Sequence, residues 1–401
     1  MAKMKYWNGT TWEVVGTDAD KKVARFVIGT STAGWTAKDC DYLCDGTNDQ
    51  EEIIQALNAL SATGGEIVIL DGTYNITASI NIPKDNVSIR GNGNATTLKR
   101  MYDSTNTDSG PTARGLITLN EKSGCKIQGL QIDGNKTTYT ASYNYGIYLR
   151  SSSNNTITSN TCNNNSNYSI YLHASNNNTV TGNTCNNNNY GIRIHSSSNN
   201  NMVIGNICNN NSDYGIYLSS SSGNMTTGNT CNNNNSVGIQ VGSSSDNTIT
   251  GNTCNNNSDG IYLSSSNNNT VIGNICNNNN SDGICLSSSS GNTITSNTCN
   301  NNNSDGIYLS SSSNNNTITG NTCNNNNDNG ICLVLSNNNT ITGNTCIRGA
   351  GQPSDYTSSQ YTIRLLGSNS NYNLISSNNC MGKDVVIDGG TSNTSVNNKY
   401  N

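Results

Sequence analysis

The sequence predicts an all-β solenoid, a single-stranded parallel β-helix with about 23 residues in each coil. Two observations lead to this fold class. Short runs of alternating polar and apolar residues recur along the chain, separated by Asn, Ser and Gly. Ten cysteines recur with them at intervals of 22 to 24 residues, and at a last interval of 34: Cys162, Cys185, Cys208, Cys231, Cys254, Cys276, Cys299, Cys323, Cys346 and Cys380. Such a period indicates stacked repeats that bury their apolar residues against one another.

One unit, NTITSNTCNNNSNYSIYLHASNN at 155–177, shows how a coil forms. Its apolar residues Ile157, Cys162, Ile170 and Leu172 have polar residues between them, as in strands with one buried face. The polar runs interrupt the 3.6-residue periodicity that a helical repeat needs. The leucine and asparagine frame of a leucine-rich repeat is also absent. Coils stacked at ~4.8 Å should give a rod about 60 Å long.

Composition excludes several classes of protein. With 32% hydrophobic and 11% charged residues, the chain of 401 residues is too polar for an ordinary globular core. A solenoid core is a thin column that needs about four inward side chains per coil, so the composition suffices. A net charge of -5 without a basic run argues against a nucleic-acid partner. No apolar stretch approaches the ~18 residues of a membrane span.

The first residues, MAKMKYWNGTTWEVV, lack the apolar core of a secretory signal. Either the protein leaves the cell by another route, such as assembly into a particle, or a signal has been removed. We therefore expect it on a virion tail or on an extracellular or cell surface.

Three segments differ in composition and in how repetitive they are: 1–22, 23–115 and 116–401. In the first, Trp7 and Trp12 flank an Asn8-Gly9 turn, which predicts a hairpin-like attachment segment. The second should be the start of the β-helix, and the third its regular part with a closing tail.

The second segment carries the clearest helix signal, over about 48–62. Capping residues and an acidic first turn precede a run of apolar residues, and Gly64-Gly65 ends it. We expect this helix to cap the open first coil. Short strands should follow, with turns at Asp71-Gly72 and at Gly91-Asn92-Gly93.

Three stretches resemble known families. The run DGTNDQEEIIQALNALSATGGEIVILDGTYNI, followed by NVSIRGNG, resembles the N-terminal region of pectate-lyase-like β-helix proteins, especially those of phage and prophage tails. The repeats resemble those of the NosD-like group, and MKYWNGTTWEVV resembles N-terminal stretches of phage tail proteins. These resemblances imply a right-handed parallel β-helix and a tail-spike-like role, but the repeats specify fold and not activity.

The cysteine column is expected to be a buried ladder of thiols. Free cysteine is among the most buried residue types. In-register side chains point the same way, so they rarely satisfy the disulfide torsion angle. No column pairs cysteine with histidine at zinc spacing, and we expect no cofactor there.

Two further columns should be structural. Eight aliphatic residues, interrupted by Thr226, should line the core: Ile157, Val180, Val203, Ile249, Val271, Ile294, Ile318 and Ile341. An Asn stands two residues before each ladder cysteine, and its amide is expected to hydrogen-bond from coil to coil: Asn160, Asn183, Asn206, Asn229, Asn252, Asn274, Asn297, Asn321, Asn344 and Asn378.

The second strand of each coil gives a column that should face outward, because it lies between inward Ile and Leu. It contains Tyr148, Tyr171, Arg193, Tyr217, Gln240, Tyr262, Cys285, Tyr308, Cys332 and Arg364. Exposed tyrosines in a row suit stacking on sugar rings or packing against another subunit. Packing between coils without a ligand is the alternative.

Arg150, His173 and His195 lie two positions further along on successive coils. Such a cationic patch could contact an anionic saccharide or a carboxylate. Incidental surface polarity is the simpler interpretation, and two imidazoles without a carboxylate make a poor metal site.

Aspartates precede the second strand in four units: Asp259, Asp282, Asp305 and Asp328, with Asp213 similarly placed. Stacked like charges would repel by about 1 kcal/mol per pair even in water. Either the side chains splay into solvent and cap the turn, or they collect cations such as Ca2+.

Catalysis on a β-helix would need two positioned carboxylates, or a base with Ca2+ or Arg. The best cluster comprises Asp133, Glu121, Asp108 and Asp103, near Arg114, Lys122 and Arg150. Asp133 lies in GLQIDGN, which resembles a strand end common in these β-helix proteins.

Three hypotheses follow. The favoured one is a structural or receptor-binding tail-spike-like protein, homo-oligomeric as a homotrimer, whose partners are surface polysaccharide and other tail proteins. The second is a polysaccharide depolymerase, a hydrolase or lyase with its site near Asp133. The third is a surface β-helix that stacks end to end into filaments.

Overall fold

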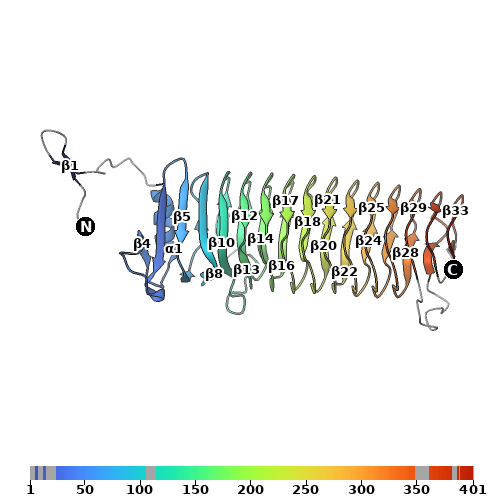
Figure 1. Cartoon of the computed structure of the whole chain (residues 1–401), viewed down its shortest axis with the longest axis horizontal. Coiled ribbons are helices and arrows are strands. Elements are labelled where there is room, and N and C mark those ends of the chain that lie inside the picture. Colours follow the sequence, from blue (N-terminus) through green and yellow to red (C-terminus); the bar gives the residue numbers. More distant parts are fainter. Residues whose placement is uncertain are drawn as a thin grey trace.

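The computed structural model describes residues 5–7, 12–14, 24–104, 114–347, 361–381, 386–387 and 389–400. From residue 24 onward the chain winds into a long rod, and successive coils lie side by side in sequence order (Figure 1). The strands pair in parallel along the rod. The predicted all-β, right-handed parallel β-helix is therefore confirmed.

Two parallel sheets run the length of the rod. The first contains β3 (Arg25–Thr30), β4 (Tyr42–Cys44), β5 (Gly65–Ile69), β6 (Gly72–Ile76), β8 (Val87–Arg100), β10 (Lys126–Asp133), β12 (Thr156–Thr158), β13 (Thr161–Asn163), β15 (Thr179–Thr181), β17 (Met202–Ile204), β19 (Met225–Thr227), β21 (Thr248–Thr250), β23 (Thr270–Ile272), β25 (Thr293–Thr295), β27 (Thr317–Thr319), β29 (Thr340–Thr342), β31 (Leu374–Ser376) and β33 (Thr394–Val396).

The second sheet has 13 strands and the longer strand of each regular coil. It contains β7 (Ile80–Asn81), β9 (Gly115–Asn120), β11 (Tyr145–Arg150), β14 (Tyr168–His173), β16 (Tyr190–His195), β18 (Ile216–Ser219), β20 (Val237–Gly242), β22 (Asp259–Ser264), β24 (Ile284–Ser287), β26 (Ile307–Ser310), β28 (Asn329–Val334), β30 (Tyr361–Leu366) and β32 (Val386–Ile387).

The strand register keeps equivalent residues of successive coils opposite one another. Ile157 pairs with Val180 in the first sheet, and Ile170 pairs with Ile192 in the second. These side chains and all ten cysteines of the column are buried, at 0 to 1% exposure. All fifteen cysteines are free, and burial raises the pKa of the Cys162 thiol to about 12.

A column of glycines makes room for the cysteines. Gly215, Gly238 and Gly260 lie at or beside the start of a second-sheet strand, against the ladder cysteine of the next coil. A Cβ at Gly260 would lie 2.7 Å from Cys276 Cβ and 2.5 Å from the Gly283 carbonyl oxygen. The cysteine column and the glycine column are therefore packed against each other too tightly for any added methyl group.

Asparagine fills three buried columns at the corners of the coils. One is the predicted column two residues before each ladder cysteine, and the other two lie on either side of it. Asn206 shows the pattern in the predicted column. Its Oδ1 accepts hydrogen bonds from the backbone N–H and the amide of Asn183, at 2.9 and 3.0 Å. Its Nδ2 donates to the Val180 carbonyl at 2.9 Å and to Asn229 Oδ1 at 3.0 Å. Every polar atom of this buried amide is satisfied.

The other two columns repeat this arrangement before the first strand and after the cysteine. They contain Asn155, Asn178, Asn201, Asn224, Asn247, Asn269, Asn292, Asn316, Asn339 and Asn373, and Asn165, Asn188, Asn211, Asn234, Asn257, Asn279, Asn302 and Asn326. Asparagine also supplies left-handed corner residues, such as Asn164 with φ 57° and Asn187 with φ 58°. Asn tolerates this conformation better than most residues, which explains why the repeats are so rich in it.

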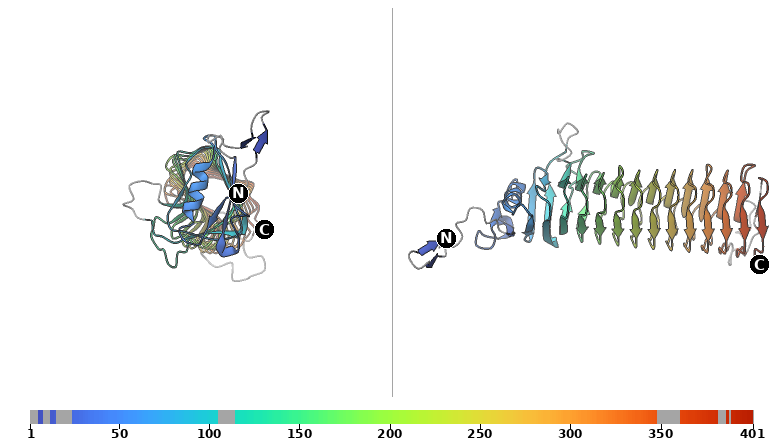
Figure 2. Two further views of the ribbon diagram at one scale, coloured as in Figure 1. Left: turned by 90° about the vertical axis from the view of Figure 1, so that its left-hand side faces the viewer. Right: turned by 90° about the horizontal axis from the view of Figure 1, so that it is seen from above.

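At the N-terminal end, α1 (Gln50–Ala59) lies across the rod (Figures 1 and 2). Its buried Ile53, Ala56 and Leu57 join the core. Asp49 precedes the helix but makes no side-chain cap; it accepts hydrogen bonds from the Gly46 and Asn75 backbone N–H groups, at 2.8 and 2.6 Å. The helix start is thereby fixed to β6. A capping role for α1 in stability stays a prediction.

Two other expectations concern the early region. β1 (Lys5–Trp7) and β2 (Trp12–Val14) pair antiparallel, while the Asn8-Gly9 turn lies outside the described residues. The predicted turn at Gly91-Asn92-Gly93 is wrong, because β8 runs through it with a register shift against β10. A short 3-10 helix, η1 (Ser31–Ala33), follows β3. In the described part of the chain, no helix has the length and apolar character needed to cross a membrane.

The tight contact between glycine and cysteine predicts a large loss of stability for Gly260→Ala. Its Cβ has backbone and Cβ neighbours at 2.5 and 2.7 Å that cannot rotate away, and such overpacking costs about 1–3 kcal/mol or more. Gly242→Ala is the matched control, because its Cβ would meet its nearest neighbour at 3.4 Å. Thermal unfolding of both variants provides the measurement; equal melting temperatures would contradict the packing argument.

Thr226 interrupts the aliphatic column and is 0% exposed, and its Oγ1 has no hydrogen-bond partner. Thr226→Val keeps the shape and removes the buried hydroxyl, so it should stabilise the fold by about 1 kcal/mol. Thr250→Val, on the outward position of the next coil, should change little. A loss of stability in Thr226→Val, measured by chemical unfolding, would show that the hydroxyl has a partner.

Candidate functional site

The outer face of the second sheet carries most of the candidate residues. Strands β11, β14 and β16, and the segment just before β18, bring a second line of tyrosines beside the predicted column: Tyr145, Tyr168, Tyr190 and Tyr214. Tyr190 and Tyr214 precede Gly191 and Gly215, whose inward positions face Cys208 and Cys231. This line was not predicted, although its spacing of 22 to 24 residues was a signal in the sequence.

The expectation that Tyr148 and Tyr171 are exposed is wrong. They are 2% and 7% exposed and stack on each other with ring centroids 5.2 Å apart. Tyr145 and Tyr168 pack against Tyr171 and complete a small aromatic core outside the main one. For these residues the packing interpretation holds. The accessible, half-buried members of the face are Tyr190, Tyr214 and Tyr217, followed by Tyr262 and Tyr308 along the rod.

Arg193 lies at the centre of the aromatic face. Its guanidinium carbon is 5.0 Å from the Tyr168 ring centroid and 5.1 Å from that of Tyr217. It also donates a hydrogen bond to the Tyr168 hydroxyl, while its buried Nε has no partner. Cation–π contacts across three coils hold the tyrosines in line.

Arg150, His173 and His195 form a row across β11, β14 and β16, as predicted from their spacing. The two imidazole rings lie 5.8 Å apart. Tyr171 Oη lies 3.1 Å from His173 Nδ1, and His195 Nδ1 donates to the Ser219 carbonyl at 3.3 Å. Burial lowers the pKa of both imidazoles, and neighbouring positive charges lower it further.

Further along the same face, Asp259, Asp282 and Asp305 stack on successive coils. Asp259 Oδ1 accepts the Asp282 backbone N–H, and Asp282 Oδ1 accepts that of Asp305, both at 3.0 Å. Asp282 and Asp305 are 6% and 5% exposed, so the expectation that they splay into solvent is wrong. Burial raises their pKa values to about 6 and about 7, so protonation relieves the repulsion between them only as the pH falls towards these values.

Asp328 and Asp213 do not belong to this aspartate column. One coil is a residue longer, so Asn329 continues the column and donates its amide to Asp305 Oδ1 at 2.7 Å. Asp213 is also one residue out of the column, because Tyr214 occupies the column position in its coil. Asp282, Asp305, Asp328, Tyr308 and Arg364 line a groove of about 500 Å³. A Ca2+ site at these aspartates stays a prediction.

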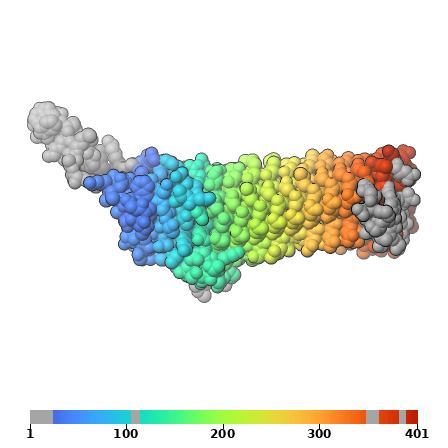
Figure 3. All heavy atoms as spheres, turned by 60° about the horizontal axis from the view of Figure 1, so that its bottom comes forward, coloured from blue at the N-terminus to red at the C-terminus, as the bar shows by residue number. Residues whose placement is uncertain are grey.

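The early carboxylates are not brought together as one site. Asp133 ends β10, and its Oδ1 accepts hydrogen bonds from Asn135 N–H and the Asn164 amide, at 3.1 and 3.2 Å. Glu121 lies before β10, in an exposed turn at another corner of the coil. Asp103 accepts hydrogen bonds from Ala141 and Asn144, and Asp108 lies outside the described residues. The carboxyl groups of Asp103 and Asp133 thus hold the loop between β10 and β11, where the rod bulges in its cyan-to-green part (Figure 3).

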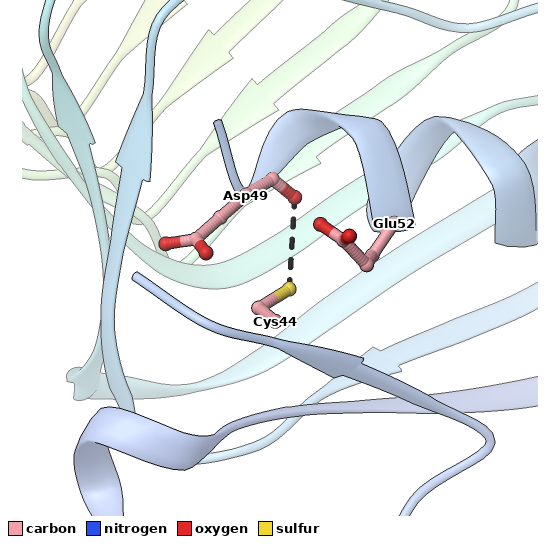
Figure 4. Close-up of side chains that lie close together, drawn as sticks. All are labelled: Cys44, Asp49 and Glu52. Carbon is pink, nitrogen blue, oxygen red and sulfur yellow. Dashed lines mark hydrogen bonds between the residues drawn. The ribbon is translucent and has the colours of Figure 1, made fainter. Parts of the chain in front are cut away.

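One further cluster lies under α1. Cys44, Asp49 and Glu52 bring their ligand atoms within 4.8 Å of one another, the one such group among the described residues (Figure 4). The Cys44 thiol faces the Asp49 carbonyl oxygen at 3.6 Å, and burial raises the pKa of the thiol. No sequence signal pointed to this cluster, because it depends on how the helix packs on β4.

Comparison with known proteins identifies the family. The model for NosD, described as a periplasmic copper-binding protein, matches residues 80–281 and 276–401. The chain belongs to the NosD family. No curated protein sequence matches it.

Solved structures share the fold of this NosD-family chain at low identity. The A-module of mannuronan C-5 epimerase AlgE4 from Azotobacter vinelandii superposes with a TM-score of 0.61 at 17% identity, over 93% of this chain and 100% of the module. Tailspike protein 3 of bacteriophage CBA120 has a TM-score of 0.65 at 14% identity, over 99% of this chain and 65% of the tailspike. The Dettilon tailspike superposes with a TM-score of 0.62 at 18% identity, over 87% of this chain and 66% of the tailspike.

Among the described residues of this NosD-family chain, neither the cluster under α1 nor the pair of histidines fits copper. Copper prefers thiolate, thioether and imidazole ligands. The cluster under α1 offers two carboxylates and a protonated thiol, and Asp49 already accepts two backbone hydrogen bonds. The two histidines are separated from the buried cysteine column by the sheet. We assign no copper chemistry to these residues.

The buried aspartates predict a stability that falls as the pH rises. Their folded pKa values, about 6 and about 7, lie above the ordinary 3.8. The folded state therefore binds more protons than the unfolded state over this range, so stability is lost towards pH 8. Asp282→Asn with Asp305→Asn should restore an Asn ladder and raise stability at pH 8 by on the order of 2 kcal/mol.

Unfolding midpoints between pH 4.5 and 8 test this expectation. The double variant should lose most of the pH dependence, the rest coming from carboxyls such as Asp259 whose pKa burial also raises, whereas Asp246→Asn, at an exposed corner, should keep it. An unchanged pH profile in the double variant would rule out the two carboxyls as its cause.

Proposed function

We propose that this chain is a rigid, tail-spike-like or surface rod that binds a saccharide along the outer face of its second sheet. The observation that carries the proposal is the line of accessible tyrosines. Tyr190 and Tyr214 lie 5.5 Å apart by ring centroids, and Tyr214 and Tyr217 lie 5.1 Å apart. Aromatic rings in line suit the apolar faces of successive sugar rings.

The architecture supports this role. The Asn columns and the cysteine column hold each coil in a fixed register, so the tyrosines are positioned before a ligand arrives. Preorganisation reduces the entropy that binding costs. Parallel β-helices of the same fold include phage tailspike proteins and a mannuronan epimerase module. That likeness supports the proposal at the level of fold.

Catalysis is not part of the proposal. The carboxyl groups of Asp133 and Asp103 serve loop hydrogen bonds, and Glu121 lies at a different corner. No pair of described carboxylates near Asp133 flanks an open cleft in the manner of a glycosidase. The depolymerase hypothesis therefore has no geometric support here.

A glycan array probed with the full chain tests the proposal. At least one saccharide should bind, and Tyr190→Ala with Tyr214→Ala should weaken binding at least about tenfold, since two stacking contacts of about 1 kcal/mol are lost. Tyr190→Phe with Tyr214→Phe keeps both rings and should retain binding. Tyr372→Ala removes a tyrosine that is 62% exposed at a corner away from this face, and it is the matched control.

Product analysis of the bound saccharide completes the test. Bound chains should be recovered at their original length, as a binding role requires. An array without any bound saccharide, or full affinity in the folded double Ala variant, would contradict the proposal. Shortened chains would favour the depolymerase hypothesis.

A further inference from the structure

The row formed by Arg150, His173 and His195, here called the cationic edge, borders the tyrosines at the C-terminal ends of β11, β14 and β16. All three side chains are partly exposed. Arg150 donates one hydrogen bond, to Asn120 Oδ1 at 3.3 Å. A guanidinium carries five N–H donors, so the others remain for a ligand. Their planar arrangement is suited to a carboxylate.

The two imidazoles present a matched pair of ring nitrogens. Both Nδ1 atoms are engaged within the protein, by Tyr171 Oη and by the Ser219 carbonyl. Among the described residues, neither Nε2 atom has a hydrogen-bond partner. With ring centroids 5.8 Å apart, the pair can donate two N–H groups to one anionic ligand once protonated.

The surroundings of the pair are positively charged. His173 is acted on by His195, Arg150, Arg114 and Arg193, and His195 by Arg193. Each of these charges repels a proton from the imidazoles. An anion placed there is attracted by the arginines, and by the histidines once they are protonated.

We propose that the cationic edge binds the carboxylates of an acidic saccharide, a polymer of uronate units, whose sugar rings lie against Tyr190, Tyr214 and Tyr217. This inference rests on the proposed saccharide-binding function and names the class of ligand. Arg150 supplies the permanent charge, and the two histidines supply a charge that depends on pH. The buried Tyr171 fixes the position of His173 through its hydroxyl.

The direction of the pH effect follows from the imidazoles. Burial and the neighbouring charges lower the pKa of both, so both are neutral at pH 7.5 and gain protons as the pH falls. The anion binds the protonated form more tightly, so binding should strengthen at acidic pH. Higher salt should weaken it, because the contacts are charged and partly exposed.

Binding of polygalacturonate to the full chain, measured by calorimetry at pH 5.5 and 7.5, tests the inference. Affinity should be at least tenfold higher at pH 5.5, and the methyl-esterified polymer should not show this gain. His173→Gln with His195→Gln should abolish the gain, whereas His173→Arg with His195→Arg should give tight binding at both pH values. Lys126→Gln removes an exposed charge from the first sheet and is the matched control.

Melting temperatures of all variants must stay close to that of the parent protein. A loss of binding then reflects a change at the binding site and not unfolding. Equal affinity for the acidic and the esterified polymer would overturn the inference, as would a pH gain that persists in the Gln double variant. If a neutral glycan still binds and depends on Tyr190 and Tyr214, the proposed function stands although the inference fails. If no saccharide binds, both fail.

Discussion

The rod depends on one repeated interaction, the buried hydrogen bond from an asparagine amide to the asparagine of the next coil. Many of these amides also accept a backbone N–H from the coil before and donate to a backbone carbonyl of that coil, as Asn206 does. A buried amide with an unmade hydrogen bond costs about 1–3 kcal/mol, so a slip of one residue would be penalised in three columns at once. This constraint fixes the register of every coil. A thin apolar core is enough because the register does not depend on it alone.

Fixed register turns single residues into columns, and the chemistry of a surface then follows from variation along a column. Where the second-sheet strands begin, the column changes along the rod from tyrosine to Val237, then to Asp259, Asp282 and Asp305, and finally to Asn329 and Tyr361. The interior beneath stays the same. A change in function along such a rod therefore needs only outward substitutions, and the tyrosine part and the aspartate part have become distinct environments in this way.

Membership in the NosD family and the fold of the tailspikes and the epimerase module describe the scaffold. They do not describe a site, because a site on a solenoid consists of outward side chains that the scaffold leaves free to vary. The copper in the family description illustrates this. Of the soft ligands that copper prefers, the ten ladder cysteines of this chain are buried in the core and the two histidines lie beside arginines.

The sequence by itself determined the solenoid, its parallel strands and the inward position of Ile157, Cys162 and Val180. The repeat of 23 residues indicates stacked coils, and the alternation of apolar and polar residues within each strand indicates which side chains face inward. It also placed His173 beside His195. It did not show that Tyr148 and Tyr171 are buried, because their burial depends on how the rings of a second line of tyrosines pack against them, which the spacing of that line does not state. Nor could it show that Asn329 and not Asp328 continues the aspartate column. One residue added in a corner changes the spacing along the sequence, while the strands still stack in register. Tertiary structure decided these points, since exposure depends on neighbours from other coils, and the cluster of Cys44, Asp49 and Glu52 exists only where a helix packs on a strand.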